Sequence, residues 1–352
     1  MPVLTEDNLL KFANALLIAG GSTDDEAQIV ARSLVQSNLR GHDSHGVMRI
    51  PFYLDRVKHG IIKPGATIKI EHESPGTMVC SGGWGFGQVV ARQVMDGTIT
   101  KAAGMGIASG TLKHSAHIGR LGEYAEMATE KNMASIIVAN THGAAQRVAP
   151  VGGKRPRLGT NPICIGMPGG RSGPFVLDFG TSATAEGKVR VKKIAGETVP
   201  DGWLLDPDGK PTNDPHQLYG EPPGTILPMG GDQAYKGFGL SFMIEMLSGA
   251  LSGGQCAYSD PPPPVGNCAT FIVMDPQLFA GYEHLKSEVL ALEDYVRNVP
   301  RIDGAGDIIL PGDPERNTLA QRADTGISLD DGNWNALKTL AEELGVELSA
   351  AT

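Results

Sequence analysis

Apolar side chains recur every three or four residues in two stretches near the start of the chain, which is the spacing of amphipathic helices. The first stretch contains Leu9, Leu10, Phe12, Ala13, Leu16 and Leu17, and the second contains Ile29, Val30, Leu34, Val35 and Leu39. Gly20 and Gly21 separate the two helices, and Thr5 and residues 22–25 are their candidate N-caps. A third helix is predicted over residues 50–57, because a proline is tolerated in a first turn.

From residue 66 onward the pattern changes to short alternating or apolar runs. Residues 66–79 alternate as a half-exposed strand does, and strands are also predicted over residues 106–112 and 134–140. Helical spacing returns at residues 89–103 and 121–131. Strands that alternate with helices predict an α/β fold.

The rest of the chain is rich in glycine and proline and breaks into short segments. Short apolar runs occupy residues 163–167, 175–179 and 188–194, and a strand and turn are predicted over residues 202–210. Further helices are predicted over residues 235–250, 283–299 and 334–344, and a core strand over residues 271–274.

The charge balance and the cysteines narrow the class of protein. The 352 residues include 30 Lys and Arg against 39 Asp and Glu, a formal net charge of −9, without a basic run. Because neutralising phosphates needs a basic surface, we expect no nucleic-acid partner. The four cysteines lack C-x-x-C spacing, which favours reduced thiols. The N-terminus lacks a signal-peptide pattern and no long apolar window occurs, so we expect a soluble cytoplasmic protein without a membrane partner.

Residues 40–49 concentrate two histidines, two arginines, an aspartate and a serine directly after a predicted helix. His45 and, further on, His117 are candidates to exchange a proton with a substrate oxygen, because imidazole titrates near neutral pH. Arg49 is the candidate to hold a carboxylate through two parallel hydrogen bonds. Arg49 follows His45 by four residues, so the two would share a face if the segment were helical. The alternatives are that the histidines cap helices and that Arg49 is a solvated helix charge.

Two familiar kinds of site are disfavoured. His42 with His45, and His114 with His117, have the three-residue spacing of metal ligands on a helix, but no third ligand stands out, so no metal is predicted. Residues 82–87 are rich in glycine, but they do not form G-x-G-x-x-G after a clear strand, and no acidic residue follows at the required distance. A Rossmann fold is therefore not predicted.

Seven motifs follow one another in a fixed order along nearly the whole chain. They are residues 41–49 (GHDSHGVMR), 115–122 (SAHIGRLG), 158–162 (LGTNP), 177–182 (LDFGTS), 187–189 (GKV), 235–240 (YKGFGL) and 310–313 (LPGD). This order resembles the malate/L-lactate dehydrogenase family, a non-Rossmann family that also includes ureidoglycolate and sulfolactate dehydrogenases and cyclic-imino-acid reductases. Residues 117–122 and 315–318 look most like its bacterial hydroxycarboxylate dehydrogenases.

The resemblance implies a distinctive α/β fold in which a cofactor domain is inserted between helical N- and C-terminal portions. We accordingly predict a helical domain formed by residues 1–75 and 255–352 and an NAD(P)-binding α/β domain formed by residues 76–254. The resemblance also implies NAD or NADP as cofactor, a small 2-oxo or 2-hydroxy acid as partner, and a homodimer whose active sites involve both subunits.

On matching positions, the resemblance implies that His117 transfers the proton, that Arg49 holds the substrate carboxylate, and that His45 borders nicotinamide and substrate. The cofactor-binding positions that it implies are His45, Gly119, Arg120, Leu121, Asp178, Phe179, Gly180, Thr181, Ser182, Lys236, Glu315, Arg316 and Asn317. Thr160 and Asn161 are expected beside the substrate.

One mechanism is the leading hypothesis. Hydride from NAD(P)H reaches C2 of a 2-oxo acid while Arg49 holds the carboxylate, His117 protonates the carbonyl oxygen and His45 orients the substrate. Many family members have asparagine where this chain has Ala116, so the substrate stays open among malate-like, lactate-like and aryl-lactate-like acids. A second substrate carboxylate would need another cation, for which the candidates are Arg120, Arg147 and Lys154.

Three other functions remain as alternatives. The nearest is reduction of a cyclic imino acid such as piperideine-2-carboxylate or pyrroline-2-carboxylate, in which the proton demand differs. A non-catalytic relative that keeps the fold is a second, and the two histidines and Arg49 speak against it. A metal-dependent hydrolase is the third.

Overall fold

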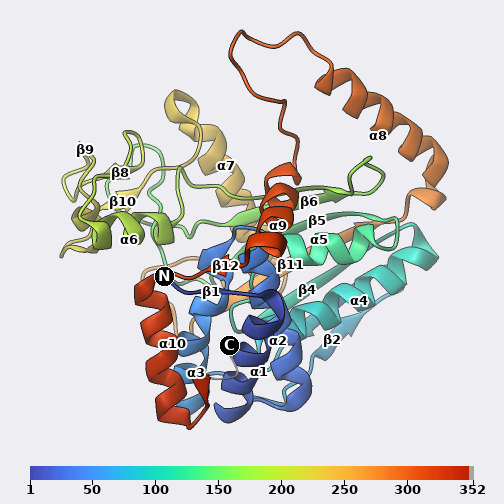
Figure 1. Cartoon of the computed structure of the whole chain (residues 1–352). Coiled ribbons are helices and arrows are strands. Elements are labelled where there is room, and N and C mark those ends of the chain that lie inside the picture. Colours follow the sequence, from blue (N-terminus) through green and yellow to red (C-terminus); the bar gives the residue numbers. More distant parts are fainter. Residues whose placement is uncertain (349–352) are drawn as a thin grey trace.

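A seven-stranded mixed sheet forms the centre of the molecule in this computed structural model, which describes residues 1–348 (Figure 1). In spatial order its strands are β2 (Lys69–Glu73), β3 (Thr77–Ser81), β4 (Ile107–Ser115), β11 (Asn267–Met274), β5 (Ala134–Asn140), β6 (Pro162–Met167) and β7 (Phe175–Gly180). Neighbouring strands are antiparallel except β3 and β4. A Rossmann sheet is mostly parallel, so the mostly antiparallel sheet agrees with the prediction against that fold.

Two helices pack on this sheet and close its hydrophobic core. They are α4 (Gly87–Met105) and α5 (Gly122–Thr129), which confirm the helices predicted in these regions. Val94 of α4 and Phe271 of β11 are fully buried in this core. Tyr124 of α5 meets the Phe271 ring edge-on, with 5.5 Å between the ring centroids.

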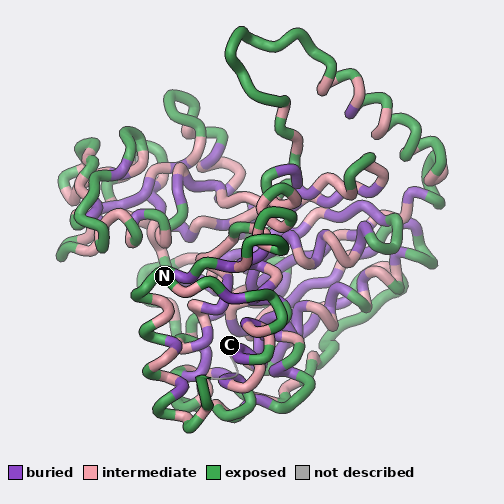
Figure 2. Tube along the Cα trace, viewed as in Figure 1, coloured by how far each residue is buried: buried purple, intermediate pink, exposed green. Residues whose placement is uncertain are grey.

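A second core lies among helices from both ends of the chain. They are α1 (Glu6–Ala19), α2 (Asp24–Leu39), α3 (Ile50–Lys58), α9 (Asp313–Thr325) and α10 (Asp331–Leu344). The apolar faces predicted for the first two helices are buried there, and their outer faces are exposed (Figure 2). Thr5 caps α1, and Thr23 caps α2 in a capping box with Glu26. The short strands β1 (Val3–Leu4) and β12 (Ile327–Ser328) pair and join the two ends of the chain.

Smaller elements surround these two cores. A third apolar cluster forms around α6 (Glu186–Ala195), β8 (Leu204–Leu205), β9 (Pro211–Thr212), η3 (Pro215–Tyr219) and β10 (Thr225–Ile226). A helical segment follows, made of η4 (Gly231–Gln233), α7 (Ala234–Glu245) and the π-helical turn η5 (Met246–Ala250). After η6 (Pro276–Leu278), the helix α8 (Tyr282–Arg297) and its following loop project from the molecule (Figure 1).

Several segments differ from the predictions. The predicted strand at residues 66–79 is the hairpin β2–β3, because its chain turns between Ser74 and Thr77. The apolar segment at residues 188–194 belongs to the helix α6, and α9 was not predicted as a helix. β11 lies at the centre of the sheet although residues 255–352 were assigned to the helical portion, because strand pairing joins residues that are distant in sequence. The domain boundaries themselves stay predictions.

The sequence predicts neither a membrane-spanning helix nor a disulfide bond among the four cysteines. Within residues 1–348, no helix has both the length and the apolar composition that a membrane span requires. Cys80, Cys164, Cys256 and Cys268 are free thiols, and three of the four are buried. Reduced cysteines were the state predicted from their spacing.

Candidate active site

The loop that carries His45 and Arg49 consists of two short 3-10 turns between α2 and α3. These turns are η1 (Asp43–His45) and η2 (Val47–Arg49), and Gly46 separates them. Gly46 is required because a Cβ there would lie 2.2 Å from Asn38 Oδ1, the atom that accepts the Val47 N–H at 2.9 Å. The segment is thus not one continuous helix. His45 and Arg49 were expected to share a helix face only if it were, so that expectation does not apply.

Hydrogen bonds attach this loop to the helix α9, which lies late in the chain. Asp43 accepts hydrogen bonds from Arg322 at 2.7 and 3.0 Å and from Asn38 Nδ2 at 2.7 Å. Arg49 Nε donates to the Ser44 carbonyl at 2.6 Å, which anchors the guanidinium at its inner nitrogen. A contact that spans 279 residues of sequence therefore helps to position the histidine loop.

His117, just after β4, faces His45 with 5.3 Å between the ring centroids. Tyr53 from α3 also contacts His117, and its Oη lies 2.7 Å from His117 Nδ1. Gln88 from α4 donates its Nε2–H to Tyr53 Oη at 3.0 Å. We call His45, Arg49, Tyr53, Gln88 and His117 the histidine site. The structure thus places His45 and His117 in contact, and Arg49 lies close enough for its charge to lower the pKa of both rings.

The pKa values of both site histidines are lowered. Burial, reinforced by the charge of Arg49, lowers the pKa of His45 to about 3. Burial, followed by the charges of Arg49, His45 and Arg56, holds the pKa of His117 well below its usual value. Both rings are therefore neutral at pH 7, and each offers one N–H donor and one lone pair. Arg49 supplies a fixed positive charge beside them.

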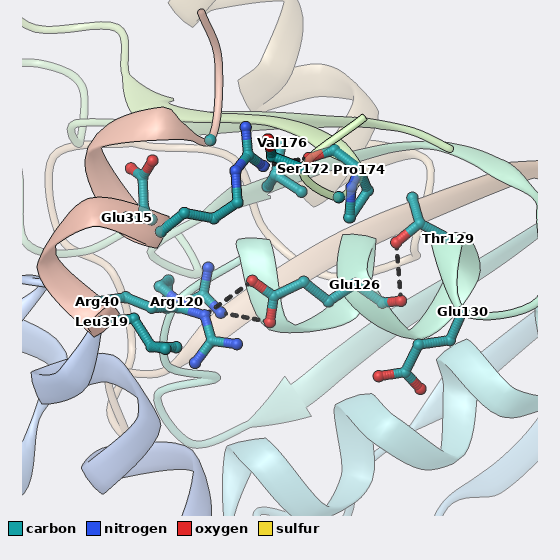
Figure 3. Close-up of a pocket in the computed structure, with 13 residues that line it drawn as sticks. Arg40, Arg120, Glu126, Thr129, Glu130, Ser172, Pro174, Val176, Glu315 and Leu319 are labelled. Carbon is teal, nitrogen blue, oxygen red and sulfur yellow. Dashed lines mark hydrogen bonds and ion pairs between the residues drawn. The ribbon is translucent and has the colours of Figure 1, made fainter. Parts of the chain in front are cut away.

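A pocket of about 290 Å³ with charged walls is lined in part by Arg120, which follows His117 by three residues and whose charge acts on His45 (Figure 3). It is lined by Arg40, just after α2, and by residues of α5, α9 and the segment around β7. The predicted cofactor residues Arg120, Glu315 and Arg316 are among them. We call Arg40, Arg120, Glu126, Glu315 and Arg316, which line this pocket, together with the neighbouring Asp178, the charged cleft.

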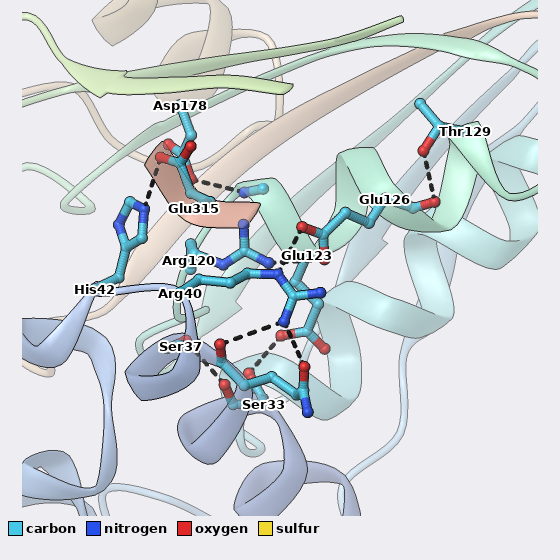
Figure 4. Close-up of polar contacts among 12 residues, drawn as sticks. Ser33, Ser37, Arg40, His42, Arg120, Glu123, Glu126, Thr129, Asp178 and Glu315 are labelled. Carbon is cyan, nitrogen blue, oxygen red and sulfur yellow. Dashed lines mark hydrogen bonds and ion pairs between the residues drawn. The ribbon is translucent and has the colours of Figure 1, made fainter. Parts of the chain in front are cut away.

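Opposite charges are paired within the charged cleft (Figure 4). Arg120 is only 3% exposed and donates to one Glu126 oxygen at 2.8 Å, and Arg40 Nε donates to the other at 3.0 Å. His42 Nε2 lies 3.3 Å from Glu315, and this hydrogen bond is the main cause that lowers the pKa of Glu315. These pairs hold the charged groups of the cleft in fixed orientations.

Asp178 lies near the end of β7, where the charged cleft approaches α5. Its Oδ2 accepts the Gly122 N–H at 2.7 Å, at the N-terminal end of α5. Burial raises the pKa of Asp178, and the charges of His42 and Arg120 act against this rise. The charge of Arg120 also lowers the pKa of His45, so Arg120 links the cleft to the histidine site electrostatically.

Thr160 and Asn161, predicted beside the substrate, lie in the turn before β6. Thr181 donates to the Thr160 carbonyl through its N–H at 2.9 Å and its hydroxyl at 3.1 Å. Asn161 is fully buried, and its Nδ2 donates to Glu245 at 2.6 Å and to the Ser241 carbonyl at 3.1 Å. The Asn161 amide therefore anchors α7, and its contact with substrate stays a prediction.

The other predicted cofactor positions surround these two groups. Gly119, with φ of +77°, directs its N–H to His117 Nδ1 at 3.3 Å. The Leu121 side chain is buried in the core of the sheet, so only its backbone can face a ligand. Lys236 and Asn317 are exposed on α7 and α9. The end of β7 and the turn after it contain Phe179, Gly180, Thr181 and Ser182.

Sequence analysis did not single out Tyr53 or Gln88 as site residues. Gln88 is a polar residue on a buried helix face, since Gln88, Ala91 and Met95 follow helical spacing and all are 0% exposed. A glutamine on such a face is the signal that could have indicated it. For Tyr53 we find no such signal, because an aromatic residue is ordinary on the apolar face of a helix.

The histidines of the predicted pair His114 and His117 contact different neighbours. His114, with φ of +50°, packs against Trp84 and His142 at centroid distances of 5.5 Å. His117 instead faces His45. Over the part of the chain that the structure describes, no group of three or more His, Cys, Asp or Glu side chains is arranged to hold a metal ion.

Known proteins resemble this chain over almost its full length. Residues 4–338 match the family model for malate/L-lactate dehydrogenase. The chain belongs to the malate/L-lactate dehydrogenase family. It is 37% identical to hydroxycarboxylate dehydrogenase B of Escherichia coli (strain K12), over 96% of this chain and 93% of that protein. This likeness confirms the resemblance of residues 117–122 and 315–318 to the bacterial hydroxycarboxylate dehydrogenases of the malate/L-lactate dehydrogenase family.

Solved structures of malate/L-lactate dehydrogenase relatives share the fold. A putative malate/lactate dehydrogenase from E. coli has a TM-score of 0.93 at 35% identity and covers 100% of this chain and 98% of its own. The delta1-piperideine-2-carboxylate reductase of Pseudomonas syringae pvar. tomato has a TM-score of 0.82 at 28% identity, with coverages of 97% and 100%. The predicted α/β family fold is thus confirmed, and the chain is an oxidoreductase of a 2-hydroxy acid dehydrogenase family.

Proposed function

We propose that this protein transfers a hydride between a nicotinamide cofactor, NAD or NADP, and C2 of a 2-oxo or 2-hydroxy acid. The observation that carries the proposal is the grouping of His45, Arg49 and His117 beside the charged cleft. The reaction needs a proton-exchanging group, a carboxylate ligand and a place for a charged cofactor. These two adjoining groups of residues offer all three.

Arg49 is proposed to hold the substrate carboxylate. Its charge lowers the pKa of both site histidines, so a carboxylate bound to it would lie near both rings. Arg120, the first candidate to hold a second carboxylate, is buried and paired with Glu126. This pairing supports an acid whose one carboxylate at the reacting end is recognised by Arg49.

His117 is proposed to exchange the proton with the substrate oxygen, and His45 to orient the substrate. Because the pKa of His117 is lowered, its neutral ring can accept the hydroxyl proton of a 2-hydroxy acid. A bound carboxylate offsets the charge of Arg49, which raises the pKa of His117 and favours the protonated ring that reduction requires. Substrate binding and proton uptake are therefore expected to be coupled.

The charged cleft has groups that suit a dinucleotide. The partly exposed Arg316 guanidinium is a candidate ligand for phosphate oxygens, and the buried Arg120, paired with Glu126, adds positive charge to the wall. The carboxylates of Asp178 and Glu315 are candidate acceptors for ribose hydroxyls. Gly312, whose φ of +88° favours glycine, leaves room for the Arg316 guanidinium, since a Cβ there would lie 2.6 Å from Arg316 Nη1. When bound, the cofactor supplies or accepts the hydride. We propose as its ligands His45, Gly119, Arg120, Leu121 (backbone), residues 178–182, Lys236 and residues 315–317.

Reduction of a cyclic imino acid is the second candidate function. The likeness to the P. syringae reductase favours it. A cyclic imine can bind already protonated on nitrogen, in which case a neutral His117 would not have to supply the proton. The two functions therefore differ in their dependence on His117.

The decisive test follows oxidation of NADH and of NADPH by absorbance. The panel contains oxaloacetate, pyruvate, 2-oxoglutarate, phenylpyruvate and piperideine-2-carboxylate. Turnover of a 2-oxo acid would support the first function, and preference for the imine would support the second. No turnover of any of the five by folded protein that binds NADH would contradict both.

We also propose that the protein acts in the cytoplasm as a homodimer. Apolar side chains are exposed along α7 and just after η5, among them Phe242, Met243 and Leu251. A second copy would cover this apolar surface, which is unfavourable in water. Phe242→Glu should convert dimer to monomer by light scattering, and a monomeric wild type would contradict the proposal.

A further inference from the structure

Tyr53 places a buried hydroxyl directly against the inner nitrogen of His117. The side chain is 1% exposed, and its ring packs against His117 and Phe86. The distance from Tyr53 Oη to His117 Nδ1 is 2.7 Å, which is the length of a good hydrogen bond. The polar end of Tyr53 is thus aimed at one ring nitrogen.

Gln88 and Gly119 favour one direction for this hydrogen bond, and Gly119 decides between the two orientations open to the Gln88 amide. Gln88 Nε2 donates to Tyr53 Oη at 3.0 Å, so the phenol hydrogen is directed to His117 Nδ1. Burial raises the pKa of Tyr53 to about 12, so the phenol keeps that hydrogen. The Gly119 N–H also points at His117 Nδ1, at 3.3 Å. Two donors converge on Nδ1, and the hydrogen of the neutral ring must then lie on Nε2.

Gln88 itself can support either direction. Its Nε2 is used by Tyr53, whereas its buried Oε1 has no hydrogen-bond partner among residues 1–348. Turning the amide over would let Oε1 accept the Tyr53 hydroxyl and would leave Nε2 without this bond. Tyr53 Oη could then accept a hydrogen from His117 Nδ1. Each orientation leaves one amide atom unpaired, so the two orientations differ little in this respect.

We propose that Tyr53 and Gln88 are positioning residues that set the tautomer of His117. In the arrangement seen, the hydrogen lies on Nε2 and can form a hydrogen bond with a substrate oxygen. For reduction, Nδ1 takes up a second proton when substrate binds, so the imidazolium gives its Nε2 proton to the oxygen and becomes the neutral ring with hydrogen on Nδ1; oxidation runs this step in reverse. When Nδ1 carries a hydrogen, the amide of Gln88 turns over and the chain of hydrogen bonds reverses. No proton passes along this chain, because only the orientation of its hydrogen bonds changes. The mechanistic meaning of this inference rests on the proposed role of His117.

The test is a nitrogen-15 NMR spectrum of the full-length protein labelled at its nine histidines. Long-range nitrogen–proton correlations distinguish a ring with hydrogen on Nε2 from one with hydrogen on Nδ1. The signal of His117 is assigned from its absence in His117→Gln. At pH 7.5 without ligand, we expect the Nε2–H tautomer in the wild type. Observation of the Nδ1–H tautomer as the major form would overturn the proposal.

Two variants test the two positioning residues. Tyr53→Phe removes the main donor to Nδ1, and Gln88→Met removes the group that directs the Tyr53 hydroxyl. Each is expected to give a mixture of tautomers at His117. A His117 signal that stays entirely in the Nε2–H form in both folded variants would assign the tautomer to Gly119 alone and would overturn the proposal.

Tyr124→Phe is the matched control. Tyr124 is as buried as Tyr53, but its hydroxyl donates to the Ile118 carbonyl rather than to a ring. This variant should lose stability and keep the wild-type tautomer. If it changes the tautomer as much as Tyr53→Phe does, general loosening rather than the hydroxyl is responsible, and the proposal fails.

Kinetics provide a second measurement that depends on the proposed reaction. Tyr53→Phe should lower kcat for a 2-oxo acid about tenfold, because acid–base catalysis depends on the correct protonated atom. KM for the acid should change little, since Arg49 rather than His117 is proposed to bind the carboxylate. The NMR test needs no turnover, so failure of the proposed reaction and failure of the tautomer assignment are separately visible. An unchanged kcat would overturn the positioning role.

Discussion

The histidine site and the charged cleft differ in the charge state of their ionisable side chains, as His117 and Glu315 show. In the histidine site, burial and the positive charge of Arg49 hold two rings neutral, with the pKa of His45 lowered to about 3. In the charged cleft, a hydrogen bond with His42 lowers the pKa of Glu315 and keeps it ionised. Arg120 links the two groups electrostatically, since it pairs with Glu126 and its charge lowers the pKa of His45.

This difference in charge state suits two different roles, proton exchange in the histidine site and binding of a charged ligand in the charged cleft. A group that exchanges a proton must change its charge during turnover, so it needs a site in which the neutral and charged forms are close in free energy once substrate is bound. A group that holds a charged ligand must keep its charge, so it needs opposite charges and solvent nearby. We therefore expect changes in the histidine site to act on rate and pH dependence, and changes in the charged cleft to act on cofactor affinity.

The largest effect is expected from His117→Ala. Loss of the proposed acid–base group should lower kcat by roughly 10²–10⁴-fold, with little change in NADH affinity measured by fluorescence titration. His114→Ala, which alters a histidine three residues earlier in contact with Trp84, is the matched control and should keep most of the turnover. Equal losses in the two variants would remove the distinction between the histidine site and its surroundings.

Arg49→Ala should have the next largest effect. The loss of charge-assisted hydrogen bonds, worth about 1.5–3 kcal/mol each, should lower kcat/KM for the 2-oxo acid roughly 10²-fold. Because the charge of Arg49 lowers the pKa of His117, its removal should also raise that pKa. The pH at which oxidation of the 2-hydroxy acid reaches half its maximal rate should therefore rise. A pH profile that does not move would contradict the proximity of Arg49 to His117.

Acidification should lower the free energy of unfolding of the protein, because His45 is buried as a neutral ring. The folded pKa of His45 is about 3 against 6.5 for an unperturbed histidine, so below pH 6.5 the unfolded chain binds the proton more readily. The contribution of neutral His45 to the free energy of unfolding is complete above pH 6.5, and it is lost as the pH falls from 6.5 toward 3. At pH 5 the loss for His45 is about 2 kcal/mol in the free energy of unfolding. Urea unfolding of the wild type and of His45→Asn at pH 7 and 5 measures it, and identical pH dependences would disprove it.

The smallest effect is expected in the charged cleft. Arg316→Ala should weaken NADH binding roughly tenfold, or about 1.4 kcal/mol, without a shift in the pH profile of kcat. Added salt should reduce the difference, because screening weakens interactions between exposed charges. Arg171→Ala, which removes an exposed arginine paired with Asp294, is the control and should bind NADH as the wild type does. A shift in the pH profile caused by Arg316→Ala would show that the two groups are not separable.

Much of the fold and the site could be predicted from the sequence. Helical spacing identified α1, α2, α4 and α5, because each has an apolar face that is continuous in sequence. The apolar run at residues 134–140 identified β5 with the bounds that the structure shows. The motifs identified the family, and His45, Arg49 and His117 were the candidate catalytic residues. The structure places the two histidine rings in contact, with the charge of Arg49 acting on both.

Other features could not be predicted, because they depend on contacts between distant segments. β11 is predictable as a strand, but its position between β4 and β5 follows from pairing across more than a hundred residues. The two 3-10 turns around Gly46 depend on the Asn38 side chain and on Arg322 from α9. Local sequence spacing contains no information about such partners.

The sequence by itself determined which residues could do chemistry and which segments could form helices and strands. These properties depend on side-chain type and on periodicity, which are local. Only the tertiary structure decided that both histidines are neutral, because a pKa depends on burial and on charges that arrive from other segments. The tertiary structure alone also placed Tyr53 and Gln88 behind His117, and this contact determines which ring nitrogen carries the hydrogen.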